Sequence, residues 1–214
     1  MKIITLPNPL LKKKSTPVDK VNNEIKKLMD GMLSTMYKAP GIGLAAPQVG
    51  INKRIIVMDV SPRPGLKRYQ EEKNAKKQKV KPNPIQMANP EITWVSEKKK
   101  KDLEGCLSIP GYMADIIRSS ACKVKYLDKN GESKKLHAKG LLARCIQHEI
   151  DHINGILFID HLSKTKKDMI LRKIKKQQKG IILIDPSYDL LKLFLWALLN
   201  LLYPDCNPSI KTVI

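Results

Sequence analysis

The residues Gln147-His148-Glu149-Ile150-Asp151-His152 contain the pattern H-E-x-x-H. On a helix, the two histidines lie one turn apart on a single face, so both imidazoles can reach one metal ion. Glu149 follows the first histidine and can act as a general base toward a water at that metal. The alternative is a core helix with incidental histidines. It is disfavoured because two of only four histidines in the chain stand in this frame.

The residues around this pattern predict a helix from about Lys139 to Asn154. Asn154-Gly155 is typical of a helix C-terminus. A short strand over 156–159 is expected next. The apolar residues recur at the three-to-four spacing of one helix face, namely Leu141, Leu142, Cys145, Ile146 and Ile150.

Length and composition limit the class of protein. The 214 residues predict one domain with a tail, and they are enough to bury a core. Lys and Arg number 40 against 20 acids, a net charge of +20. Such a charge favours a polyanionic partner, although a general lysine bias of the surface explains it as well. The four cysteines form no C-x-x-C pair and the start of the chain lacks a signal peptide, so a cytoplasmic location is expected.

The sequence before residue 139 alternates between structured and loop-like stretches. We expect a helix over 19–38, because its apolar residues have helical spacing and Asp19 or Asn22 can cap it. Lys98–Lys101 is interpreted as a solvated charge run. The other predictions are an extended arm (1–18), an exposed proline- and lysine-rich loop (61–84), strands (54–60, 85–95, 123–127, 132–137) and a two-residue turn at Asn130-Gly131.

The C-terminal part of the chain divides into two segments. Lys164-Lys179 predicts a basic helix, with eight lysines and arginines against one acid. Residues 190–203 are almost wholly apolar, but they fall short of the roughly twenty residues of a membrane span. This tail is expected to lie at a membrane interface, pack on the domain or bind a partner. The predicted division is a catalytic domain (1–162), a basic helix (163–180) and an apolar tail (181–214).

Two histidines do not complete a catalytic metal site, which takes three protein ligands. The metzincin pattern fails because Phe158 stands where its third histidine belongs. Cys145 precedes His148 by three residues on the same face, but a ligand from another element closes the geometry better. The remaining candidates for the third ligand are the acidic residues and Cys106, Cys122, Cys145, His137 and His161.

Three separate stretches together resemble, in order and spacing, the three motifs of peptide deformylases. The resemblance spans roughly residues 5–175. It implies an α+β fold, with antiparallel sheets around a central metal-binding helix and a C-terminal basic helix. It also implies removal of the formyl group from the formylmethionine of newly synthesised polypeptides, releasing formate. The three stretches are Gly41–Gln48, Glu104–Ser108 and Gln147–His152.

The resemblance implies roles for particular residues. Glu149 is expected to be the general base and acid, and Gln48 with the Leu107 backbone N–H is expected to bind the oxyanion. The implied cofactor is one divalent ion, with Fe²⁺ expected and Zn²⁺, Ni²⁺ or Co²⁺ able to substitute. The implied metal ligands are Cys106, His148 and His152.

A substrate site is expected beside these ligands. The methionine side chain needs an apolar pocket, for which Ile42, Leu141 and Cys145 are the candidates. The backbone of Gly43 and Leu44 is expected to pair with the substrate like an added strand.

Two further features concern the cysteine loop and the pocket. Glu104 and Arg118 match family positions that form an ion pair orienting the cysteine loop. Arg144 is assigned to the rim of the substrate pocket, where many family members have an aliphatic residue.

The basic helix Lys164-Lys179 resembles a C-terminal helix that docks on the ribosome in this family. Its lysines fit that role, because lysine–phosphate contacts give non-specific, salt-sensitive affinity for RNA. The alternative is a solvated helix. Two other functions stay open. A broader metallopeptidase would cleave unformylated peptides, and a non-catalytic RNA-binding protein would be indifferent to Glu149→Gln.

Overall fold

The computed structural model describes residues 1–39, 41–62 and 81–182, with side-chain environments given up to residue 177. The chain divides into two compact units: residues 1–162 belong to the first, and the second begins at Ser163. Most of the predicted 61–84 loop and nearly all of the predicted 181–214 tail lie outside the described residues. The division into a catalytic domain, a basic helix and a tail therefore stays a prediction.

The described part of residues 1–162 contains the α-helices α1 (Asn23–Lys38) and α2 (Gly140–Ile153). The α1 helix begins after Asn22, whose side chain accepts a hydrogen bond from the Ile25 N–H and so decides between the two predicted caps. The α2 helix ends at Ile153 with Asn154 as its C-cap, and Gly155 follows with φ of 75°, the left-handed conformation of a C-terminal glycine. The described residues of this unit also include the 3-10 helices η1 (Pro9–Lys12), η2 (Ala46–Val49) and η4 (Phe158–His161).

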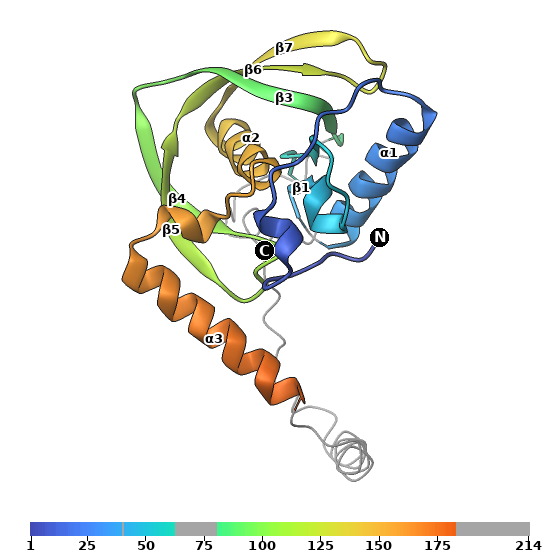
Figure 1. Ribbon diagram of the computed structural model, residues 1–214. Coiled ribbons are helices and arrows are strands. Elements are labelled where there is room, and N and C mark those ends of the chain that lie inside the picture. The colour runs from blue at the N-terminus through green and yellow to red at the C-terminus, as the bar shows by residue number, and fades with distance from the viewer. Residues whose placement is uncertain (40, 63–80, 183–214) are drawn as a thin grey trace, which may run out of the picture. The chain divides into compact units, whose positions relative to one another are not determined.

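The strands form two antiparallel sheets, which confirms the predicted α+β class. A five-stranded sheet has the order β1-β2-β3-β6-β7, and β4 pairs with β5 in a separate two-stranded sheet. Figure 1 shows α2 in the middle of this domain, with the strands wrapped around it. The strands are β1 (Gly43–Ala45), β2 (Ile55–Met58), β3 (Ile85–Val95), β4 (Lys99–Gly105), β5 (Met113–Ser119), β6 (Ala121–Leu127) and β7 (Ser133–Lys139).

The charge run Lys98–Lys101 is solvated, as predicted, and residues 99–101 also begin β4, whose backbone pairs with β5. Two other local predictions were wrong. The expected strand over 156–159 is replaced by η4, where the Asp160 side chain accepts a hydrogen bond from the Leu157 N–H. The turn at Asn130-Gly131 belongs to a longer connection, because β6 and β7 pair only up to Leu127 and Ser133.

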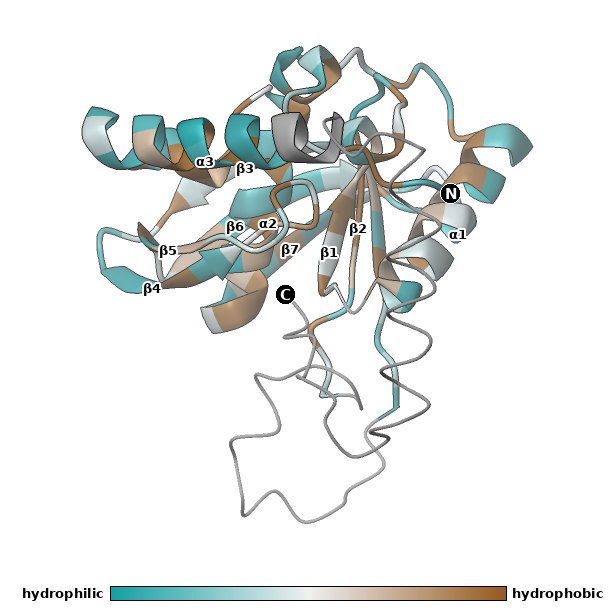
Figure 2. Ribbon diagram, turned by 90° about the horizontal axis from the view of Figure 1, so that it is seen from below, coloured by the Kyte–Doolittle hydropathy of each residue, from teal (hydrophilic) through white to brown (hydrophobic). Residues whose placement is uncertain are grey.

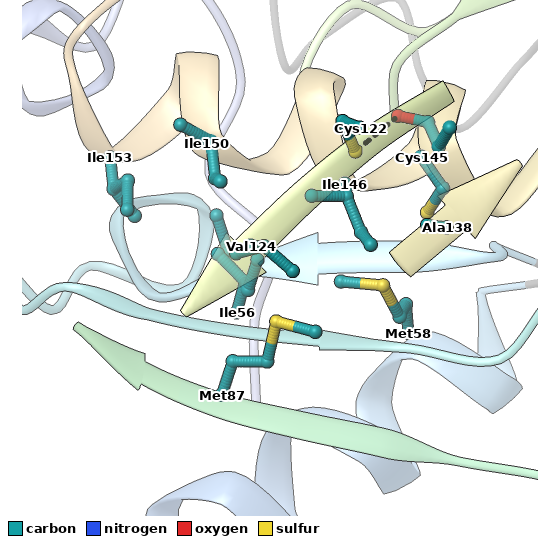
Figure 3. Close-up of a cluster of buried hydrophobic side chains, with 12 residues drawn as sticks. Ile56, Met58, Met87, Cys122, Val124, Ala138, Cys145, Ile146, Ile150 and Ile153 are labelled. Carbon is teal, nitrogen blue, oxygen red and sulfur yellow. Dashed lines mark hydrogen bonds between the residues drawn. The ribbon is translucent and has the colours of Figure 1, made fainter. Parts of the chain in front are cut away.

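The core beneath the five-stranded sheet positions α2. Figure 3 shows Ile146, Ile150 and Ile153 of α2 pointing toward the sheet residues Ile56 and Val124. Hydrophobic residues also run along β1 and β2, seen as brown in Figure 2. Burying one face of α2 in this way leaves its other face toward the site.

The second unit contains the helix α3 (Lys164–Ile182), so the predicted basic helix exists. Within residues 1–39, 41–62 and 81–182, no helix is both long and apolar enough to cross a membrane.

Candidate metal centre and active site

A cysteine and two histidines converge on one point at α2. The ligand atoms of Cys106, His148 and His152 all lie within 4.8 Å of one another. The Cys106 Sγ and the His152 Nε2 are 3.2 Å apart, and the two imidazole rings meet edge to face. Cys106 follows directly after β4, so the third member of the cluster comes from an element other than the helix.

This cluster has the donor set and size of a metal site. Bond lengths of about 2.0–2.3 Å in a tetrahedral zinc-type centre place neighbouring ligand atoms roughly 3.3–3.6 Å apart. One thiolate and two imidazoles suit Fe²⁺ or Zn²⁺. One carboxylate oxygen of the adjacent Glu149 is buried and finds no hydrogen-bond partner among the described residues. The residues present therefore fit a divalent metal with a reacting group beside it.

The Glu104 carboxylate orients His148. Its Oε2 lies 3.1 Å from the His148 Nδ1, which leaves the Nε2 of that ring for a metal. Arg118 binds both oxygens of Glu104, with its Nε at 2.7 Å and its Nη2 at 3.0 Å. The ion pair between Glu104 and Arg118 is thus present, and Arg118 also reaches Asp151 on α2 at 2.8 Å.

Glu149 is buried and closely packed. Its side chain is 3% exposed, and burial raises the pKa of its carboxyl to about 7. A Cβ added at Gly43 would collide with the Glu149 carboxylate and lie 2.8 Å from the Cys145 Sγ. Only glycine allows β1 to approach α2 this closely.

Gln48 directs its amide at the cysteine. Its Oε1 accepts a hydrogen bond from the Ala45 N–H at 2.8 Å, which turns the Nε2 toward the Cys106 Sγ at 3.5 Å. The same Nε2 donates to the Ser108 Oγ at 3.2 Å. The Ser108 N–H in turn donates to the Cys106 sulfur. The amide of Leu107 lies in the loop between these two residues.

The charges around the cluster shift the pKa of each histidine differently. Burial opposes protonation of His148, but Cys106 and Glu104 outweigh it and raise the pKa of His148 to about 10. Burial and the charge of His148 lower the pKa of His152. Burial also works against ionised Glu104, yet His148 and Arg118 hold the pKa of that carboxyl well below its usual range. A bound cation would favour the neutral form of both imidazoles.

The residues expected in the substrate pocket separate into two groups. Leu141 and Arg144 line a pocket of about 200 Å³ between α2 and the β4–β5 sheet. Ile42 and Cys145 do not line it but contact each other, with the Cys145 Sγ 3.5 Å from the Ile42 carbonyl. The Leu44 side chain is fully buried in the core beneath α1, so only its backbone is available to a ligand.

Arg144 lines the pocket, as its expected place at the rim requires, and it also has partners that were not predicted. Its side chain is buried and bound by Glu104 and by the carbonyls of Lys100 and Ile116. Sequence reasoning also missed the contact between Ser108 and Gln48. The only local signal for this contact was the position of Ser108 two residues after the cysteine.

Comparisons with known proteins agree with this geometry. The family model described as polypeptide deformylase matches residues 1–168. A peptide deformylase of Pelagibacter ubique is 48% identical over 182 residues, covering 85% of this chain and 97% of that protein. One of Methylocella silvestris is 46% identical over 177 residues, covering 83% and 84%.

A solved structure has the same fold. The peptide deformylase from Ehrlichia chaffeensis is 41% identical, with a TM-score of 0.74, and covers 86% of this chain and 99% of its own. A second structure of the Ehrlichia chaffeensis enzyme, in complex with actinonin, is 43% identical with a TM-score of 0.72 and covers 83% and 96%. With the family model matching most of the chain and relatives far above 30% identity, this chain belongs to the polypeptide deformylase family.

Proposed function

We propose that this protein hydrolyses the N-terminal formyl group of formylmethionine on newly synthesised polypeptides, releasing formate and a free amine. The observation that carries the proposal is the meeting of Cys106, His148 and His152 with the buried Glu149 beside them, in a chain of this family. The same arrangement supports the assignment of the first three as metal ligands.

A divalent ion held by these ligands supplies Lewis acidity. Glu149 takes the proton from the attacking water and later gives it to the leaving amine. The buried Glu149 carboxylate follows directly after His148 on α2, so it lies beside the reacting group in both transfers. The Gln48 Nε2 donates a hydrogen bond to the developing oxyanion, and the Leu107 N–H is the second donor. Water is consumed, the C–N bond breaks, and formate and the amine are the products.

The edge of β1 is the proposed place for the peptide backbone. Among the described strands, β1 pairs only with β2 and forms the end of the sheet. A substrate strand can therefore add at Gly43 and Leu44, since an open edge offers backbone donors and acceptors. Ile42, Leu141 and Cys145 are the proposed contacts of the methionine side chain. The pocket that Leu141 shares with Arg144 is otherwise lined mostly by polar and charged residues, among them Lys100 and Asp102, so it is not assigned to that side chain.

Finer features of the proposal concern the metal, the location and the partner. Fe²⁺ is the proposed resident ion, with Zn²⁺, Ni²⁺ or Co²⁺ as substitutes, and the cytoplasm is the proposed location. Lys164-Lys179 is proposed to dock on the ribosome, supported by the surplus of lysine and arginine on α3. Ribosome binding that weakens as salt is added, and that is lost when the lysines are changed to glutamine, is the expected result.

The test of the main function is formate release from a formyl-Met peptide by protein purified without oxygen. We expect Glu149→Gln to lower the rate by about 10²–10⁴-fold, because it cannot accept the proton. Its metal content should stay that of the wild type. An unformylated peptide serves as the control, and its cleavage would favour the broader metallopeptidase instead. No formate from folded wild-type protein with one metal bound would refute the proposal.

A further inference from the structure

We propose that Arg144 is a positioning residue for the metal centre, acting with Arg118 to immobilise the Glu104 carboxylate. This proposal rests on the proposed function, because it assumes that Cys106 and His148 are metal ligands.

The hydrogen bonds of Arg144 reach two strands. Its Nη1 lies 2.5 Å from the Glu104 Oε1 and 3.1 Å from the Ile116 carbonyl oxygen of β5. Its Nη2 lies 2.7 Å from the Lys100 carbonyl oxygen of β4. The planar guanidinium can make these contacts at once because its donors form a rigid fork. Arg144 therefore ties α2 to both strands of the β4–β5 sheet.

The Glu104 carboxylate is saturated only when Arg144 is present. Its Oε1 accepts from the Arg118 Nε and the Arg144 Nη1, and its Oε2 accepts from the Arg118 Nη2 and the His148 Nδ1. A carboxylate offers about four acceptor sites in all. With every site used, the group cannot rotate without breaking a hydrogen bond to a charged or buried donor.

This saturation links the two halves of the metal centre. Glu104 lies near the end of β4, and Cys106 follows two residues later. Arg144 lies one turn before His148 on α2. When Arg144 holds Glu104, it holds the cysteine loop and His148 at a fixed separation. Removing it would free one oxygen of Glu104 and let β4 shift against the helix.

The burial of Arg144 indicates that this contact is maintained. The residue is only 7% exposed, and a buried guanidinium is costly unless it is paired. The charge is matched by Glu104. Arg144 also lines the pocket, together with Leu141.

The test measures metal binding rather than activity alone. Co²⁺ is titrated into metal-free protein in competition with a chelator, while the thiolate-to-Co²⁺ absorption reports the geometry at Cys106. We expect Arg144→Met to weaken Co²⁺ binding by about 10–100-fold, as for other groups that orient metal ligands, and to change the absorption. Arg144→Lys, which keeps the charge without the fork, is expected to weaken binding more than about twofold but less than Arg144→Met.

Arg54→Met is the matched control. Arg54 is a half-buried arginine that ties the other end of α2, through Asn154 at 2.8 Å and the Pro90 carbonyl at 3.3 Å. We expect this variant to lose stability while Co²⁺ affinity and absorption stay unchanged.

Three results would overturn the proposal. One is wild-type Co²⁺ affinity and absorption in folded Arg144→Met. Another is an equal loss of affinity in Arg54→Met, which would indicate a general loosening of α2. The third result applies if Arg144→Met does not fold: Arg144→Lys would then bind Co²⁺ as tightly as the wild type. Failure of the wild type to bind Co²⁺ or to release formate would instead refute the proposed function.

Discussion

Two sets of residues pack against α2 at the site, one uncharged and one charged, and we call them the neutral wall and the charged wall. One wall is β1 with η2, where small and uncharged residues pack closely and Gly43 leaves no room for a methyl group beside Glu149. The other wall is the β4–β5 sheet with the cysteine loop. There Glu104, Arg118 and Arg144 form a buried network of charges.

The difference teaches that the two walls hold the helix by different forces. The neutral wall sets distances through contact between atoms, so an added atom disrupts it. The charged wall sets orientation through hydrogen bonds between ions, so a removed partner leaves a buried charge. Variants of the two walls should therefore fail in different ways.

The largest effect is expected on the charged wall. Arg118→Met should lower the free energy of unfolding of the metal-free protein by about 3–5 kcal/mol, because Glu104 and Asp151 both lose a buried partner. Urea unfolding measures it. A loss below about 1 kcal/mol, the value of exposed pairs, would mean that the network is solvated.

The next largest effect is expected on the rate of the reaction, from a substitution in the neutral wall. Gln48→Ala should lower kcat by about 10²–10³-fold, equal to about 2.7–4 kcal/mol, because a donor to the oxyanion is removed. Formate release at saturating formyl-Met peptide measures it, with metal content checked in parallel. If kcat fell less than threefold while metal stayed bound, Gln48 would have no part in the reaction.

A smaller effect tests the close packing itself. Gly43→Ala should cost about 1–3 kcal/mol of unfolding free energy and slow formate release, because the new methyl group collides with both Glu149 and Cys145 and pushes them away from β1. Gly31→Ala in α1 is the control, since its Cβ would meet only the Met1 sulfur at 3.5 Å. Equal behaviour of the two variants in thermal unfolding and activity would contradict the argument.

The smallest effect sharpens the contrast between buried and exposed charges. Glu91 and Lys125 lie 2.9 Å apart, with side chains 62% and 51% exposed. Glu91→Gln should change the free energy of unfolding by less than about 1 kcal/mol and leave formate release unchanged. The measurement is urea unfolding at low and high salt. A loss as large as that in Arg118→Met would remove the distinction between the two kinds of ion pair.

Elements with strong local signals could be predicted from the sequence. The α2 helix follows from the spacing of its apolar residues, and α1 starts at one of its two predicted caps. The β4–β5 sheet could not be predicted in the same way. Its first strand begins with three lysines, and its stability comes from pairing with residues such as Ile117 and Arg118 that follow only after the cysteine loop.

Arg144 shows the same limit within the site. The resemblance to the family assigned it to the rim of the substrate pocket, and it lines a pocket together with Leu141. Its partners Ile116, Glu104 and Lys100 lie 28, 40 and 44 residues away along the chain. The position of a residue in a motif carries no information about such partners, so the pairing of Arg144 with Glu104 was not predicted.

The sequence alone determined which residues can do chemistry here: two histidines and a glutamate on one helix, a cysteine and a glutamine in separate motifs, and membership of the family those motifs resemble. Helical periodicity is local, so it can be recognised from the order of residues in the sequence. Only the tertiary structure decided that Gly43 touches Glu149 and that two arginines share Glu104. Those contacts join distant segments, and they depend on how the sheets close around α2.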